Sequence, residues 1–421
     1  MLTTYVKLLL TLQNIYFDHF PLLYKLPFEF CRTKGNGIHV SKVKRSFDLA
    51  VSVFPAFLFA AAVFFFNVAM YLCFPLLRNP MGDVKMWSWG LLAIVCFCGL
   101  VFYTLWMLVY KSEAVFMFNE IFRHEEEPRK DPSLCPDMVS TTIEKVFLLG
   151  CNILIWNIYL FTPIAALVST YLRMDPLLPF FNFVLTMIPQ LKNLFIFFSF
   201  NSETLFYLGM FTFRVGWVTI FIYEGFRVAA FLIGLTILVG KVVISLLSSL
   251  SRLTDKFQSA ITHRGFKAHL KLYKLIMIIF QSLEGPIKPT AILAIVAGTV
   301  AVSGCSFVVV RLHGVNEVYF TGFCAVVAIS SVILTKIILD TLGNLSMASV
   351  RLLLHFGKIE ILLEMGEGHW KKLYLKELRY LKPISIPVGL GTARFSRMTQ
   401  KVKTEILMYM FEASVNLLIA F

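Results

Sequence analysis

The chain has 421 residues, of which 58% are hydrophobic and 15% are charged, whereas soluble domains are about 45–50% apolar and about 25% charged. Together with a mean hydropathy of +0.75, this composition predicts an integral membrane protein and excludes a soluble multidomain enzyme or a disordered chain. The formal net charge of +14 would suggest nucleic acid in a soluble protein, but in a membrane protein it indicates which loops face the cytoplasm, so we expect no nucleic-acid partner.

Membrane-spanning helices are the main elements that the sequence predicts. Each needs about 20 mostly apolar residues to cross roughly 30 Å of hydrocarbon. Six stretches meet this requirement, and a shorter seventh stretch follows them. In chain order they are Leu49 to Leu77, Met86 to Tyr110, Val146 to Leu172, a block inside Leu205 to Leu250, Thr290 to Val310, Val318 to Leu339, and Glu405 to Phe421.

The block from Leu205 to Leu250 is too long for one ordinary span. A helix of its 46 residues would reach about 69 Å, and Glu224 and Arg227 interrupt the apolar run. We expect these two residues to form an ion pair on one helix. Either one helix extends well beyond the bilayer, or two helices turn near Glu224. The second alternative gives nine spans if Pro176 to Phe200 also crosses, but polar residues inside that stretch favour seven.

Lysine and arginine are unevenly distributed among the connections. With seven spans, thirty of the 39 basic residues lie in the N-terminal segment and every second connection after it, and only five lie in the other connections. Basic residues gather on the cytoplasmic side. The predicted fold class is therefore an all-α polytopic membrane protein with seven transmembrane helices, a cytosolic N-terminus and an extracellular C-terminus. The first residues lack a basic start, so we expect no removable signal peptide.

These spans divide the chain into alternating membrane and cytosolic parts. The predicted order is a cytosolic segment (1–48), transmembrane helices one to four (49–250), a cytosolic helical connection (251–289), helices five and six (290–339), a second cytosolic helical connection (340–404) and helix seven (405–421). Amphipathic stretches at Val350 to Glu364 and Trp370 to Leu381 predict helices in the second connection. Such helices either pack together below the membrane, which we favour, or lie on its anionic inner surface.

Side chains that carry catalysis or bind cofactors form no recognisable pattern. The eight histidines form no HxxxH or HExxH pair, and no GxxxxGK[ST] phosphate loop occurs. The eight cysteines contain no CxxC pair, so we expect most of them to be buried as small hydrophobic side chains. The sequence therefore predicts no enzyme, no metal site and no cofactor.

The order of spans and connections resembles one protein family. Two segments carry the local likeness: HRGFKAHLKLYKLIMIIFQSLEGPI before the fifth span, and KKLYLKELRYLKPISIPVG before the terminal helix. The chain resembles a divergent, gustatory-receptor-like member of the arthropod gustatory and odorant receptor superfamily, whose members are seven-helix ligand-gated cation channels. Gustatory receptors tend to end in Thr-Tyr, five apolar residues and Gln-Phe, whereas Ala413 to Phe421 agrees only at Phe421. The gustatory and odorant classes therefore both stay open.

The resemblance implies a tetramer, of one chain or with a co-receptor, in which helix seven lines a central pore. Glu405, Glu412 and Asn416 are spaced by seven and four residues, so they share one helical face. A fourfold ring of Glu412 would attract cations. The alternative is that Glu405 lies at the cytosolic end of the helix and Glu412 pairs with a neighbouring helix.

The resemblance also implies a pocket for a small organic ligand among the outer halves of spans two to six. Aromatic residues on spans three and four are the candidates, because such ligands are held mainly by apolar and ring contacts. They are Trp156, Tyr159, Trp217 and Tyr223, and ordinary helix packing is the alternative for each. Tyr103, Trp106 and Tyr110 approach the cytosolic end of span two, so we expect them at the membrane interface.

The predicted function is that of a chemosensory receptor in the plasma membrane, acting as a non-selective cation channel that small organic tastants or odorants open. Its expected partners are the ligand, the lipid bilayer and other subunits of a homo- or hetero-tetramer. The alternative is a secondary transporter, or an orphan membrane protein that keeps the scaffold without gating. The sequence does not identify the ligand.

Overall fold

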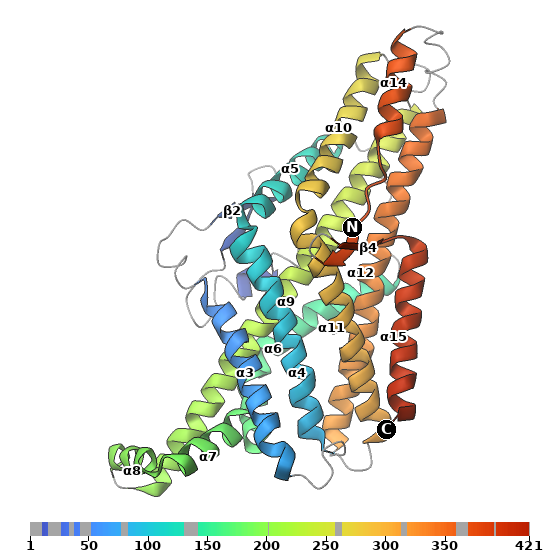
Figure 1. Ribbon diagram of the computed structural model, residues 1–421. Helices are drawn as coiled ribbons and strands as arrows, with labels where there is room; N and C mark the ends of the chain where they lie inside the picture. Colours follow the sequence, from blue (N-terminus) through green and yellow to red (C-terminus); the bar gives the residue numbers. More distant parts are fainter. Residues whose placement is uncertain are drawn as a thin grey trace.

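The computed structural model describes residues 11–15, 27–32, 38–42, 52–76, 83–129, 142–200, 202–256, 263–312, 318–358, 369–390 and 393–420. They form an elongated bundle of helices (Figure 1). We call the end that holds α10 and α14 the upper end, and the end that holds α7 and α8 the lower end, as they lie in Figure 1. The predicted all-α fold class is confirmed.

Each predicted span overlaps one helix. These helices are α3 (Phe54–Cys73), α4 (Val84–Tyr103), α6 (Thr142–Tyr171), α9 (Glu203–Lys256), α11 (Glu284–Arg311), α12 (Val318–Lys358) and α15 (Gln400–Ala420). Within the described ranges, five helices are long and apolar enough to cross a membrane, in α3, α4, α9, α11 and α12. The apolar part of α6, Ile155–Tyr171, is shorter. The count of seven spans and the orientation of the termini stay predictions.

The long apolar block is one helix. α9 has 54 residues and is unbroken at Glu224, so it reaches about 81 Å and passes far beyond the thickness of a bilayer. Of the two alternatives left open by the sequence, the structure has the single extended helix, and the nine-span alternative, which needs two helices here, does not fit it. Before it, α7 (Leu177–Met187) and α8 (Pro189–Phe198) meet at an angle of 107°, and each is only about 16 Å long.

The upper end is a packed group of helices. α10 (His263–Ser282) and α14 (His369–Tyr380) lie beside the upper ends of α9 and α12 (Figure 1). Tyr273 of α10 is fully buried, and its hydroxyl lies 2.7 Å from the hydroxyl of Ser349 on α12. Lys274 pairs with Glu377 of α14 at 2.8 Å. These helices therefore pack together, and their position below the membrane stays a prediction.

Several local elements differ from the expected ones. α12 continues beyond Leu339 to Lys358, so the sixth span and the start of the next connection form one helix; residues 359–364 of the amphipathic stretch lie outside the described part of the chain. α4 continues through a π-helix, Thr104–Val109, into α5 (Lys111–Arg129). Two antiparallel hairpins and one short 3₁₀ helix were not expected: β1 (Phe28–Arg32) with β2 (Ile38–Lys42), β3 (Pro387–Leu390) with β4 (Ala393–Arg397), and Phe74–Leu76.

Candidate ligand cavity and pore face

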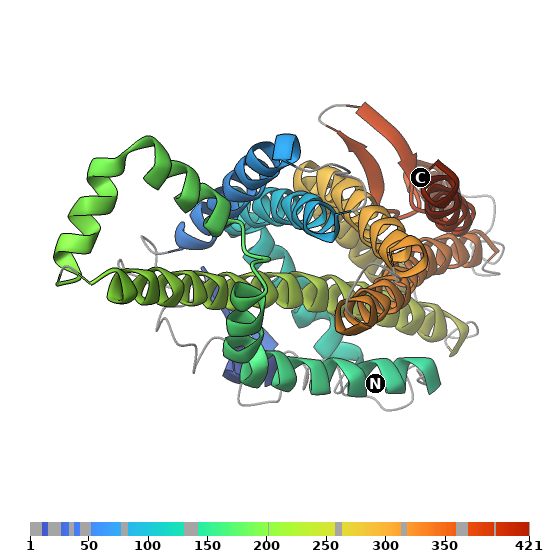
Figure 2. The same cartoon turned by 90° about the horizontal axis from the view of Figure 1, so that it is seen from below.

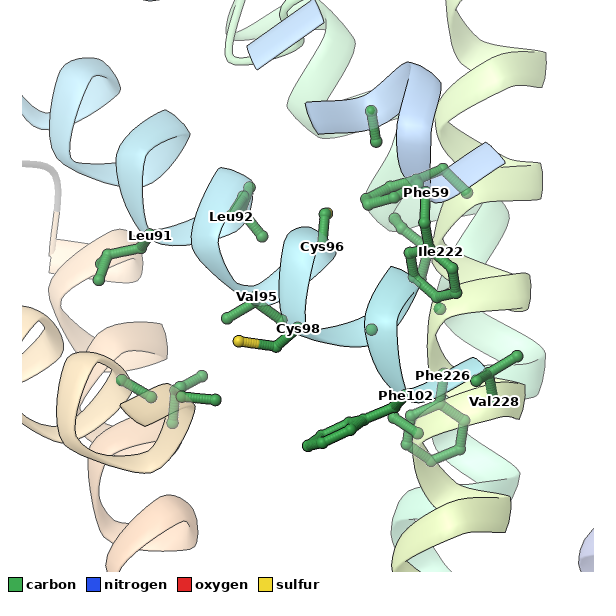
Figure 3. Close-up of a pocket in the computed structure, with 18 of the residues that line it drawn as sticks. Phe59, Leu91, Leu92, Val95, Cys96, Cys98, Phe102, Ile222, Phe226 and Val228 are labelled. Atoms are coloured by element: carbon green, nitrogen blue, oxygen red, sulfur yellow. The ribbon is translucent and has the colours of Figure 1, made fainter. Parts of the chain in front are cut away.

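A large cavity lies inside the bundle, lined by residues of α3, α4, α6, α9, α11 and α12. Its volume is about 1590 Å³, which exceeds the roughly 300–1000 Å³ of ordinary ligand pockets. Figure 3 shows Leu91, Val95 and Cys98 along α4, and Phe59 and Phe226 where α3 and α9 approach it. The cavity forms because these apolar helices cross at angles and leave the space between them partly unfilled.

The lining of the cavity is almost entirely carbon. The hydroxyl of Thr162 donates to the carbonyl oxygen of Ile158 at 2.5 Å, and that of Ser169 donates to the carbonyl oxygen of Ala166 at 3.0 Å. These hydroxyl groups therefore donate their hydrogen bonds within their own helix. Lys85 and Asp175 are charged side chains of this lining, but most of the surface is apolar. Such a surface is suited to an uncharged, largely apolar molecule, because a charged one would lose its hydration over most of the cavity without gaining partners.

One charged group at the cavity wall is held in a buried ion pair. Asp175, which lines the cavity, accepts a hydrogen bond of 2.9 Å from Nε of Arg214 on α9 and a second one from its Nη2. The same carboxylate accepts the backbone N–H of Leu178 at the start of α7, at 3.1 Å. Asp175 and Arg214 are 0% and 8% exposed, so the pair is buried. It joins α9 to the turn that leads from α6 to α7.

A second contact fixes the same turn to α4. The indole N–H of Trp89 donates to the carbonyl oxygen of Met174 at 2.6 Å, and Met174 lines the cavity. Neither contact was predicted from the sequence, because the partners lie 39 and 85 residues apart. The only indication in the sequence was that Arg214 lies inside an apolar block and Asp175 lies just after another one.

The four aromatic candidates for ligand binding lie in different surroundings. Trp217 lines the cavity and packs edge-on against Phe65, with ring centroids 5.8 Å apart. Tyr223 donates its hydroxyl hydrogen to the carbonyl oxygen of Tyr159 at 2.6 Å, and the two rings are 5.8 Å apart in the contact of α6 with α9. Trp156 is 48% exposed on the outer surface of α6. Trp217 is therefore the candidate best placed to meet a ligand.

The aromatic residues at the upper end of α4 differ from the expectation of an interfacial position. Tyr103 is fully buried and donates to the carbonyl oxygen of Ser52 at 2.5 Å. The indole N–H of Trp106 donates to the hydroxyl of Thr290 on α11 at 2.8 Å. For Tyr103 the prediction of an interfacial side chain is wrong, because hydrogen bonding inside the bundle satisfies its polar atom.

The expected ion pair in α9 is present and deeply buried. Nη2 of Arg227 lies 2.9 Å from Oε2 of Glu224, and both side chains are 0% exposed. The prediction of a helical pair is confirmed. Because a carboxylate and a guanidinium neutralise one another here, α9 carries two charged residues through the middle of the bundle.

The three pore candidates share the exposed face of α15. Met410 and Ser414 are buried on the opposite face, where α15 packs on α11 and α12. Glu405, Glu412 and Asn416 are all exposed, and Glu405 pairs with the exposed Lys401 at 3.8 Å. Figure 2 shows α15 at one edge of the bundle, with α7 and α8 at the opposite edge.

From Glu405 onward, the exposed face of α15 is otherwise apolar. Met408, Tyr409, Phe411 and Ile419 are between 57% and 75% exposed. Glu412 has no ion-pair partner in the part of the chain that the structure describes. An unpaired carboxylate on a helix this apolar is costly in contact with lipid, so this face needs water or another subunit.

Comparison with known proteins gives structural matches. No family model matches the sequence, and no curated protein matches it. The insect olfactory receptor OR5 from Machilis hrabei superposes with a TM-score of 0.59 at 12% identity, over 99% of this chain and 97% of that one. The chain has the fold of an insect olfactory receptor. The same receptor in complex with eugenol matches with a TM-score of 0.59 at 12% identity, over 99% of this chain and 98% of that one. The fold that the sequence resemblance predicts is therefore confirmed.

Proposed function

We propose that this protein is a chemosensory receptor of the plasma membrane, a non-selective cation channel that small organic tastants or odorants open. The observation that carries this proposal is the large apolar cavity inside a bundle with the insect olfactory receptor fold. A receptor with this fold has been solved in complex with eugenol, a small aromatic molecule. The lining of the cavity here suits the same chemical class, and Trp217 offers a ring for stacking.

The proposed pore is formed by α15 in a tetramer, either of this chain alone or with a co-receptor chain. The support is the exposed face that carries Glu405, Glu412 and Asn416 among apolar side chains. Four copies around an axis would bury the apolar side chains against neighbouring subunits and turn the polar ones toward water. A ring of four Glu412 carboxylates would then concentrate cations at a constriction.

Helix α11 connects the proposed ligand site with the proposed pore. Its residues Ala294, Ala297 and Ala301 line the cavity, and the same helix packs on α15. A Cβ atom added at Gly298 of α11 would lie 3.5 Å from the Cε atom of Met410 on α15. A ligand that contacts α11 differently in two arrangements of these helices shifts their populations, which is how binding opens the channel.

The test is a patch-clamp recording from cells that express the chain, alone and with a co-receptor, during application of a panel of uncharged odorants and tastants. We expect a ligand-evoked cation current. Glu412→Gln removes the charge and keeps the size of the side chain, so it lowers permeability to divalent cations. Glu405→Gln removes a charge from the same face nearer the start of α15, and we expect a smaller effect. Unchanged permeation in Glu412→Gln would remove Glu412 from the pore.

The alternative functions and the orientation have their own outcomes. A secondary transporter would carry substrate without channel-like current, and an orphan scaffold would give no current with any ligand or co-receptor. An extracellular C-terminus predicts that a tag after residue 421 is labelled on intact cells. Labelling only after permeabilisation would overturn the proposed orientation.

A further inference from the structure

Two buried cysteines lie where α11 packs on α12. Cys305 of α11 and Cys324 of α12 belong to the same small cluster of buried side chains, and both line the large cavity. Both are free cysteines and both are buried, with 6% and 4% exposure. Neither residue belongs to the proposed pore face or to the aromatic candidates for ligand binding.

The register of the two helices accounts for this meeting. Cys305 lies six residues before Arg311, the last residue of α11, and Cys324 lies six residues after Val318, the first residue of α12. Each thiol is therefore about 9 Å along its helix from the connection between them. Consecutive helices that pack side by side bring residues at equal distance from their connection to the same level. The backbone therefore brings the two residues to the same level of the contact between α11 and α12.

The surroundings give small molecules access to both sulfur atoms. Cys305 and Cys324 line the large cavity, and Phe307, Val308 and Leu312 pack around them in a small apolar cluster. In the proposed orientation the connection after α11 is extracellular, so this end of the cavity faces the oxidising side of the membrane. A small neutral oxidant can enter the cavity without the large desolvation free energy that a charged one would need.

We propose that Cys305 and Cys324 are an oxidisable dithiol, which hydrogen peroxide converts into a disulfide between α11 and α12. One cysteine loses its proton, its thiolate attacks an oxygen of the peroxide and the O–O bond breaks; the released proton joins the leaving hydroxide, so a sulfenic acid and one water form. The second thiol attacks the sulfenic sulfur, forms the S–S bond and releases the second water. One peroxide is reduced to two waters while two thiols lose their hydrogens.

The expected consequence is a stiffer wall between the cavity and α15. α11 contacts both α12 and α15, so a covalent link at Cys305 limits the movement of α11 against α12. A disulfide needs the two Cα atoms within about 7 Å, and cysteines at the same level of two directly packed helices can meet this requirement by side-chain rotation and a small shift of the helices. Oxidation therefore raises the melting temperature of the protein in the absence of any ligand.

The test uses the full-length protein in lipid nanodiscs, treated with hydrogen peroxide and then digested without reduction. Mass spectrometry is expected to find a peptide pair joined through Cys305 and Cys324, two hydrogens lighter than the reduced pair and separated by a phosphine reductant. The melting temperature rises by several degrees on oxidation and falls back on reduction. Both signals disappear in Cys305→Ser and in Cys324→Ser.

Cys98→Ser is the matched control, because Cys98 also lines the cavity but lies on α4. This variant keeps the cross-linked peptide and the rise in melting temperature. Persistence of reduced Cys305 and Cys324 while Cys73 or Cys151 is oxidised would overturn the proposal. So would sulfinic acids without a cross-link, or a link from either thiol to Cys98. None of these readouts depends on channel activity.

Discussion

The buried pair of Asp175 with Arg214 offers the sharpest test of how the cavity wall is built. Asp175→Leu removes the acceptor of two arginine hydrogen bonds and of the backbone N–H of Leu178. Arg214→Leu leaves the carboxylate buried with that N–H as its remaining described partner. Breaking a buried pair by removing one partner costs about 3–5 kcal/mol, because the other charge stays without compensation. We expect a loss of this size in each single variant.

The double variant Asp175→Leu/Arg214→Leu removes both charges at once. Its loss of unfolding free energy is expected to be smaller than the sum of the two single losses by about 3 kcal/mol, because no unpaired charge stays buried in the double variant. The free energy of unfolding is measured by SDS titration of the protein in mixed micelles for the four members of the cycle.

An exposed pair in the same protein gives the matched control. Lys274 and Glu377 lie 2.8 Å apart, but their side chains are 36% and 37% exposed. The same cycle with Leu at these positions should give a coupling of about 0–1 kcal/mol. Additive losses at Asp175 and Arg214, within about 0.5 kcal/mol, would refute the claim that this pair holds the turn to α9.

Two further predictions concern helix packing and pH. A Cβ atom at Gly240 of α9 would stand 2.5 Å from the Cγ2 atom of Thr341 on α12, so Gly240→Ala is expected to lower the free energy of unfolding by about 1–3 kcal/mol. Adding Thr341→Ser, which deletes that methyl group, should recover most of the accompanying loss in melting temperature. No recovery would contradict the close contact. Burial lowers the pKa of His269, whose Nδ1 atom has no partner among the described residues, so the unfolded chain takes up a proton more readily and stability falls as the pH drops below about 6.5. His269→Leu should flatten this fall in melting temperature between pH 7.5 and 5.5, and an unchanged slope would assign the pH dependence to other groups.

Hydropathy predicts the helices well because the bilayer imposes one length and one chemistry on each span. It does not predict where α12 ends, because the residues after the predicted span, which ends at Leu339, are held in the helix by packing, with Leu352 and Phe356 buried. Local spacing found the pair of Glu224 with Arg227, which lie three residues apart on one helix.

The candidate site was predictable only where one helix carries it. The shared face of Glu405, Glu412 and Asn416 follows from helical geometry, and the structure leaves that face exposed. The cavity depends on how α4 crosses α9 and α11, and no local pattern encodes those crossings. For this reason Tyr159 and Tyr223, which look like Trp217 in the sequence, lie in a helix contact and not on the cavity wall.

The central claim is that a molecule in the cavity opens the channel, and filling the cavity tests it most directly. Gly225 lines the cavity on α9, and a Cβ atom there meets nothing within 4 Å. Gly216 on the same helix also has free space at its Cβ, but it does not line the cavity. Patch-clamp recordings of Gly225→Leu and Gly216→Leu are compared at equal surface expression. We predict that Gly225→Leu shifts the ligand concentration for half-maximal current at least tenfold, whereas Gly216→Leu responds as the unmodified protein does; equal responses of the two variants would contradict the claim.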